Sequence, residues 1–337
     1  MRTSESFMHQ VPTPLPDEHA VSIIYRWFQM TRFETLESFI QVNGCSSKLN
    51  SPRRLWCPLY SELAHALLSK YSLADFISKF TNIHDYSLFL DESAFQGLSI
   101  ETILKKLSTF KFSNALNVLQ DKYWRYCPEC ANEDEQKYGT TYLHVEHQCL
   151  YKRVCNKHSV LLEELASCHV SLPPSNNLSI LASQSDIEKD VALLGWVSEL
   201  TDTPPEERKL RVLNLLRQKA CVYSYDRKNP YQVQRVQYMQ NILAKRFNSS
   251  VYKRYFDWGK LTSGHYPLNS SGGLMHFLEP EKHFHPMFYL MLIDLFLTRD
   301  EFNLSLEFLL NTSNIRREIP PVVLPLDIRE LVKASAA

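Results

Sequence analysis

Two short pairs of potential metal ligands constrain this chain more than any other feature of its sequence. The first pair is Cys127 and Cys130, the second is Cys155 and His158, and 24 residues separate them. Each pair holds two ligands three positions apart, so one tight turn can present both to the same ion. Three thiolates and one imidazole suit Zn²⁺, and four protein ligands leave no open coordination position. The spacing therefore predicts a structural zinc site that fixes the middle of the chain.

Buried unpaired thiols or a disulfide are the alternatives to a metal site. The chain has eight cysteines in 337 residues, an N-terminus without signal-peptide features and no apolar run long enough to span a bilayer. These features favour a reducing compartment. The longest apolar stretch, residues 287–297, is short and contains Asp294, so we expect a buried helix there. The sequence thus predicts a cytoplasmic protein without a membrane segment.

The composition is that of a globular, mainly helical protein. Hydrophobic residues make up 44% of the chain, and it has only 8 glycines, which disfavours Gly-rich nucleotide-binding folds and β architectures with many turns. Apolar residues recur at helical spacing in most segments. Asp17 and Glu18 are expected in the first turn of the first helix, where negative charge suits the helix dipole. Further helices are expected near residues 35–42, 59–68, 73–80, 100–107, 185–200, 204–218, 232–247, 251–258, 284–297 and 300–310.

We predict three modules along the chain. Residues 1–120 form an N-terminal helical module that resembles a helix-turn-helix unit, and residues 121–170 form the zinc-binding segment. Residues 171–184, which include two consecutive prolines, form a linker. Residues 185–337 form a basic C-terminal helical module.

The formal net charge of zero hides a strongly basic segment. Between Arg208 and Lys260, thirteen basic residues oppose two acidic ones, a local net charge of +11, and tyrosines and a tryptophan lie among them. This mixture is typical of a surface that contacts a phosphate backbone, although a solvated basic helix surface would look the same. The helices expected at 232–247 and 251–258 fit either a DNA-reading pair or an ordinary helical hairpin. Candidate phosphate contacts are Arg227, Lys228, Arg235, Lys245, Arg246, Lys253 and Arg254.

Enzymatic interpretations of the same residues are weaker. His144-Val145-Glu146 has the H-x-E pattern of zinc deaminases, but their C-x-x-C follows that pattern, whereas here it precedes it. A metal-dependent nuclease would need clustered carboxylates or a histidine base, which the sequence does not bring together. The chain also lacks the G-x-x-x-x-G-K-[ST] motif of an ATPase. We therefore expect a protein that is not an enzyme, in which His144 and His147 are packing or supporting groups rather than ligands.

The residues around the ligand pairs form a longer pattern. It reads Arg125-Tyr126-Cys127-Pro128-Glu129-Cys130, then Gly139, Tyr142, His144 and His147-Gln148, then Val154-Cys155-Asn156-Lys157-His158 and Leu161-Leu162. This pattern resembles the TniQ/TnsD family of transposition target selectors. Weaker likenesses are Leu15-Pro16-Asp17-Glu18 with Ser22 and Arg26, and His285-Pro286 before an apolar helix. Leu143, Asn156 and Ser159 stand where the family usually has an aromatic residue, proline and glycine, and none of these departures removes a ligand.

The resemblance implies a non-enzymatic adaptor in a prokaryotic cytoplasm. Such a protein recognises target DNA, or an RNA-guided effector complex on DNA, and recruits the AAA+ ATPase TnsC. The basic segment favours direct reading of DNA, whereas the length of the chain is short for a DNA-reading selector and fits docking on a guide complex. A zinc-containing transcription regulator would share the helical and basic features, but it would usually be a symmetric dimer on a palindrome.

Overall fold

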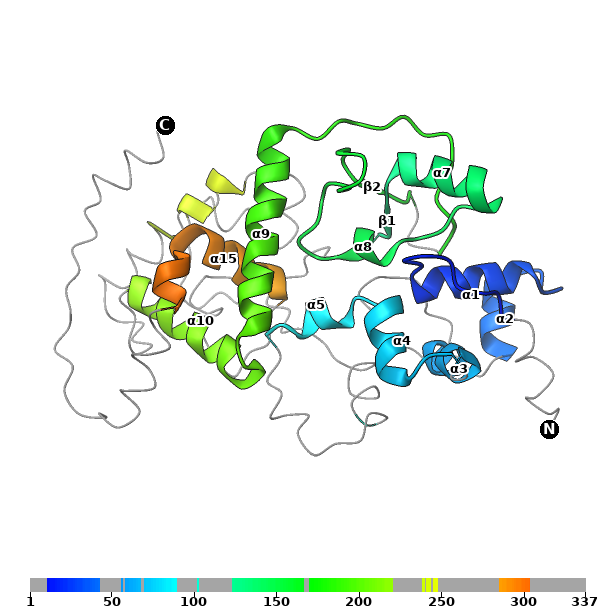
Figure 1. The fold of residues 1–337 in the computed structure, drawn as a ribbon, viewed down its shortest axis with the longest axis horizontal. Helices are drawn as coiled ribbons and strands as arrows, with labels where there is room; N and C mark the ends of the chain where they lie inside the picture. Colours follow the sequence, from blue (N-terminus) through cyan, green and yellow to red (C-terminus); the bar gives the residue numbers. More distant parts are fainter. Residues whose placement is uncertain are drawn as a thin grey trace. The chain divides into compact units, whose positions relative to one another are not determined.

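The computed structural model confirms a mainly helical protein (Figure 1). Cys127, Cys130, Cys155 and His158 form a cluster near the middle of the sequence. The described residues up to Leu297 belong to one compact unit, and those from Thr298 belong to a second. None of the helices in these parts of the chain is both long and apolar enough to span a membrane. The structure describes residues 11–42, 56, 58–67, 70–89, 102, 123–166, 170–220, 238–239, 241–243, 245–247 and 285–303.

The first five helices form an N-terminal group around buried aromatic rings. Trp27 meets Phe39 edge-on with ring centroids 5.2 Å apart, and Trp56 meets Phe76 in the same way at 6.0 Å. All four side chains are buried, so ring packing contributes to the core of this group. The helices are α1 (Ala20–Gln29), α2 (Leu36–Val42), α3 (Pro58–Leu67), α4 (Leu73–Phe80) and α5 (Ile83–Ser87).

The predicted start of the first helix is wrong. Helix α1 begins at Ala20 with His19 as its N-cap, and Asp17 has a left-handed backbone with φ 56°. Glu18 lies outside the helix because its buried carboxylate accepts a 2.6 Å hydrogen bond from Arg26. These two acids therefore serve tertiary contacts that outweigh the modest gain from the helix dipole.

The segment before α1 is joined to the zinc-binding segment by backbone hydrogen bonds. The amide of His19 donates to the carbonyl of Leu143 at 2.8 Å, and the Leu143 amide donates to Ser22 Oγ at 3.1 Å. The Val145 amide donates to the carbonyl of Asp17 at 2.8 Å. The N-terminal helices and the zinc-binding segment thus form one framework, while the module boundaries proposed from the sequence stay predictions.

Within the zinc-binding segment, the sequence did not predict helix α7 (Pro128–Tyr138). Cys127 caps its N-terminus by accepting a hydrogen bond from the Cys130 amide, and Pro128 occupies the first turn, where a missing N–H costs nothing. Gly139 ends it in the left-handed conformation. The other elements are the short helix α8 (Val145–Gln148) and the antiparallel strands β1 (Arg125–Tyr126) and β2 (Glu163–Glu164), in which Arg125 faces Glu164.

Among the described residues after the zinc-binding segment are the helices α9 (Gln184–Asp202), α10 (Pro205–Ala220) and α15 (Pro286–Phe296). Helix α15 packs against both α9 and α10 (Figure 1). Its residues from Met287 to Ile293 are all buried, as expected for a helix that is apolar on every side. His285 and Pro286, which the resemblance singled out, are its N-cap and first residue. The helices expected near 100–107 and 251–258 lie almost entirely outside the described residues.

Two positions of the zinc-binding segment should respond oppositely to substitution. Gly139 and Ser159 have left-handed φ values of 70° and 54°, a conformation in which a Cβ atom costs about 1–2 kcal/mol. Nothing lies within 4 Å of a Cβ at Gly139. We expect Gly139→Ala to lower the free energy of unfolding by about 1–2 kcal/mol. Ser159→Gly should raise the free energy of unfolding by about 0.5–1 kcal/mol. The relief of backbone strain in the folded state exceeds the free-energy cost of the greater entropy of the unfolded chain.

Urea unfolding of the zinc-saturated protein measures both effects. Gly139→Asn is the control, since asparagine tolerates this conformation better than alanine. A lower unfolding midpoint for Ser159→Gly would mean that the exposed serine side chain contributes more than its backbone strain costs.

Candidate metal centre

The four predicted ligands come from two separate segments of the chain and lie close together. Cys127 and Cys130 lie at the N-terminus of α7, and Cys155 and His158 lie in a turn that we call the knuckle, residues 155–158. Their candidate ligand atoms all lie within 4.8 Å of one another. The three cysteines are buried and His158 is partly buried, so the cluster faces the protein interior.

The distances inside the cluster fit a tetrahedral zinc ion. With Zn–S near 2.3 Å and Zn–N near 2.0–2.1 Å, a tetrahedron requires about 3.8 Å between sulfurs and about 3.6 Å between sulfur and nitrogen. Cys130 Sγ lies 3.7 Å from Cys155 Sγ. His158 Nδ1 lies 3.4 Å from the sulfurs of Cys127 and Cys130 and 3.7 Å from that of Cys155. These three cysteines are free thiols, which leaves their sulfurs available to a metal.

The electrostatics of the cluster also call for a cation. Hydrogen bonding with Cys130 lowers the pKa of Cys127, but hydrogen bonding with Cys155 and burial outweigh it and raise the pKa to about 11. Hydrogen bonds with Cys127 and Cys155, together with burial, raise the pKa of Cys130, whereas hydrogen bonds from the other two thiols lower that of Cys155. Without a cation, three thiols this close together favour a state in which only one is deprotonated. A divalent cation supplies the positive charge that stabilises all three as thiolates.

The knuckle is held by a small hairpin. The amide of Cys155 donates to the carbonyl of Val160 at 2.9 Å, and the amide of Ser159 donates back to the carbonyl of Cys155 at 2.8 Å. Val160 and Leu162 pack against the cysteines. The left-handed φ of Ser159 closes this turn, which gives a physical reason for the glycine that the family usually carries there.

Comparison with known proteins agrees with this geometry. The TniQ family model matches residues 10–162. The chain carries a TniQ domain. This match confirms the predicted family relationship, and it includes α1 to α5, α7, α8 and all four ligand residues. No curated protein matches the chain.

The other motif residues of the TniQ domain have structural roles. Gln148 pairs with strand β1 like a further strand: its Oε1 accepts from the Arg125 amide at 3.0 Å and its Nε2 donates to the Arg125 carbonyl at 2.7 Å. His144 lies between two carboxylates, with Nε2 2.8 Å from Asp134 and Nδ1 3.4 Å from Asp17. His147 is buried with Nε2 3.8 Å from Cys130 Sγ. Neither histidine belongs to the four-residue cluster.

The predicted phosphate contacts are only partly described. Lys245 and Arg246 are exposed, as a phosphate contact requires. Part of the basic segment is used internally instead. Lys209 and Arg211 are buried, because α10 packs against neighbouring helices, so neither belongs to the basic surface expected from the charge pattern. The other five candidates, Arg227, Lys228, Arg235, Lys253 and Arg254, lie outside the described residues.

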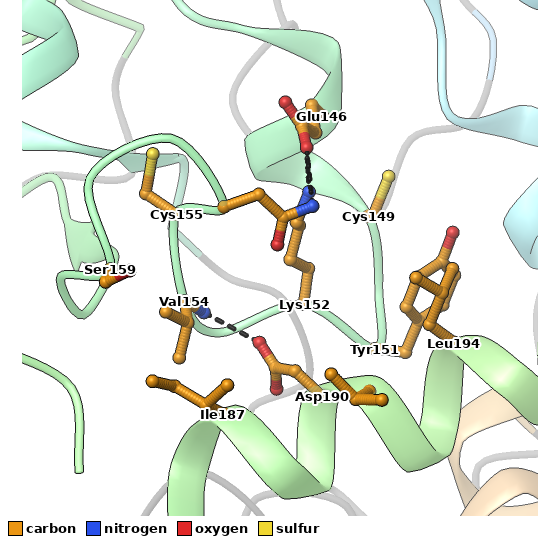
Figure 2. A pocket seen from close by; sticks show the side chains of 12 residues that line it. Glu146, Cys149, Tyr151, Lys152, Val154, Cys155, Ser159, Ile187, Asp190 and Leu194 are labelled. Carbon is orange, nitrogen blue, oxygen red and sulfur yellow. Dashed lines mark hydrogen bonds and ion pairs between the residues drawn. The ribbon is translucent and has the colours of Figure 1, made fainter. Parts of the chain in front are cut away.

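A cavity of about 410 Å³ lies between the TniQ domain and helix α9 (Figure 2). Ile187, Val191 and Leu194 of α9 form an apolar wall, and Val191 and Leu194 are 62% and 46% exposed. The Glu146–Lys152 ion pair lies on the opposite side. This site combines an apolar ridge at helical spacing with charged groups, which suits contact with another protein segment.

Two carboxylates of helix α9 contact the TniQ domain beside this cavity, and Asp186 does so through an ion pair with Arg153 at 3.9 Å. Asp190 Oδ2 accepts hydrogen bonds from the backbone amides of Arg153 at 2.6 Å and of Val154 at 2.7 Å, and Figure 2 shows the bond from Val154. The Asp190 side chain is buried. The knuckle and α9 are therefore connected through the residues directly before Cys155.

Loss of one zinc ligand should lower folded yield and zinc content together. We expect Cys127→Ser to purify with less than one zinc per chain and to melt on the order of 10 °C lower, because zinc binding contributes directly to folding. Metal analysis and circular dichroism measure both. The control is Cys149→Ser, a free thiol outside the cluster. A soluble, zinc-free Cys127→Ser protein with an unchanged melting temperature would contradict a structural zinc.

His144 should make stability depend on pH in the alkaline range. Burial lowers the pKa of His144, but hydrogen bonds to Asp134 and Asp17 outweigh it and raise the pKa to about 9. Because the folded-state pKa lies above the unfolded value of about 6.5, protonated His144 contributes its full stabilisation below about pH 6.5. This contribution is lost as the pH rises through about 9. We expect the free energy of unfolding to fall by up to about 3 kcal/mol across this interval.

Urea unfolding of zinc-saturated protein at pH 6.5 and pH 9.5 tests this expectation. His144→Gln should flatten the pH dependence, whereas His65→Gln, at an exposed position of α3, should keep it. Parallel pH profiles for wild type and His144→Gln would show that the two carboxylates do not hold an imidazolium.

Proposed function

We propose that this protein selects target sites for DNA transposition, by recognising target DNA and recruiting the AAA+ ATPase TnsC. The observation that carries the proposal is the TniQ domain with its complete Cys₃His cluster. A TniQ domain supports a role as a transposition-associated adaptor, and the geometry of the cluster fits a structural rather than a catalytic zinc. The protein acts by holding partners together and carries out no chemistry itself.

Zinc at Cys127, Cys130, Cys155 and His158 would fix α7 against the knuckle. Because hydrogen bonds join the segment before α1 to residues 143–146, the same site would also orient the N-terminal helices. We propose that these helices face the ATPase. Met30 at the end of α1 and Val42 at the end of α2 are 61% and 64% exposed and would be available for such a contact.

The basic C-terminal module would contact the phosphates of target DNA. Lys245 and Arg246 support this assignment because both are exposed. The remaining five candidates rest on the sequence alone. Phosphate contacts of this kind position a protein on DNA, while contacts to the bases would provide any sequence preference.

A second candidate function is an adaptor that docks on an RNA-guided effector complex. The cavity beside α9 favours it, because an exposed apolar ridge next to an ion pair suits a protein partner better than DNA. The TniQ domain supports both forms of adaptor over a transcription regulator.

Binding of the purified protein to a fluorescent duplex library over a salt series separates these functions. For a DNA reader we expect a selected sequence and a steep, linear fall of log K with log salt. Replacing both Lys245 and Arg246 by Ala should reduce the slope by about 2, since each phosphate contact contributes about 0.9. Lys137→Ala, at an exposed position of α7, is the control.

Weak, unselective binding that the double variant leaves unchanged would overturn direct DNA reading. Recruitment of TnsC is tested in the same preparation by ATPase-dependent co-sedimentation. A protein that binds DNA selectively but never associates with the ATPase would instead be a regulator.

A further inference from the structure

Helix α7 brings a carboxylate to the outer side of the ligand His158. Glu133 Oε1 lies 3.1 Å from His158 Nε2, while Nδ1 of the same ring faces the three sulfurs. The two ring nitrogens therefore have separate partners. One points at the proposed metal and the other at a carboxylate on α7.

This arrangement defines the state of the imidazole. A neutral histidine has one nitrogen with a lone pair and one that carries a proton. Metal binding through Nδ1 requires the lone pair there, so Nε2 carries the proton and donates it to Glu133. In metalloproteins, a carboxylate partner of this kind fixes the ring orientation and makes the ligand a stronger base.

The position of Glu133 on α7 suits this role. It follows Cys130 by three residues, so both side chains lie on the same face of the helix, one turn apart. Glu133 Oε2 also pairs with Lys157, the residue just before His158. Both carboxylate oxygens thus hold consecutive residues of the knuckle. The Glu133 side chain is 47% exposed, so these bonds contribute little to overall stability and act mainly through geometry.

We propose that Glu133 is a positioning residue for zinc: by accepting the Nε2 proton of His158, it presents Nδ1 to the metal. The proposal rests on the zinc site proposed above. It adds to the four ligands a fifth side chain on which metal affinity depends.

Zinc affinity of the full chain tests the proposal. Competition with a chelator of known affinity should show a 10- to 100-fold loss for Glu133→Ala. Glu133→Gln should lose only a few-fold, since its amide oxygen still accepts from Nε2–H. The matched control is Glu135→Ala, two positions along the same helix and exposed, which should bind like wild type. Nitrogen NMR of the zinc-loaded protein should show Nδ1 of His158 bound to metal in the wild type and a disturbed signal in Glu133→Ala.

Three outcomes would count against the idea in different ways. Wild-type protein that binds no zinc would overturn the metal site itself, and this proposal with it. Zinc-binding wild type with equal affinity in Glu133→Ala would overturn the role of Glu133 alone. Lys157→Met removes the other partner of Glu133 and should stay within about twofold of wild type. A loss as large as that of Glu133→Ala would assign the effect to surface charge instead.

Discussion

The convergence of α7 and the knuckle on one point is the constraint on which the rest of the structure depends. Apart from α7, the described part of the zinc-binding segment has two strands of two residues each and the four-residue helix α8, so little regular secondary structure holds the rest of it in place. Its cysteines, with Val160 and Leu162, form their own apolar cluster. A metal at that cluster would replace the large core that so short a segment cannot build. The N-terminal helices and α9 both attach to this fixed centre.

Two adjacent acidic residues of α7 contact different parts of the TniQ domain around the metal centre. Glu133 contacts the knuckle through His158, and Asp134 contacts His144, whose other nitrogen meets Asp17 before α1. Neighbouring residues on a helix project about 100° apart, so one turn of α7 can contact the knuckle on one side and His144 on another. The polar sequence of α7 thus reflects its use as a connector between two parts of the TniQ domain.

Sequence reasoning predicted the ligands and most described helices, because both depend on local spacing. The ligands of each pair are three positions apart, α3 and α4 have apolar residues at helical spacing, and α15 is an almost continuous apolar run. Helix α7 lacks such a period, and its signals were the proline after Cys127 and the glycine at 139. The contacts of Asp17 and Glu18, and the burial of Lys209 and Arg211, depend on residues distant in sequence. Charge counting therefore overestimated the basic surface.

The attachment of α9 through Asp190 has a mechanical consequence. The helix continues for twelve residues beyond Asp190 to Asp202, a distance of about 18 Å at 1.5 Å per residue. A rotation of about 10° at this anchor would displace the far end by about 3 Å. The wall of the cavity lies on both sides of this anchor, with Ile187 on the short side and Val191 and Leu194 on the long side, and α9 also packs on α15. A tilt of α9 about Asp190 would therefore move its far end, next to α10, more than the residues that contact the TniQ domain.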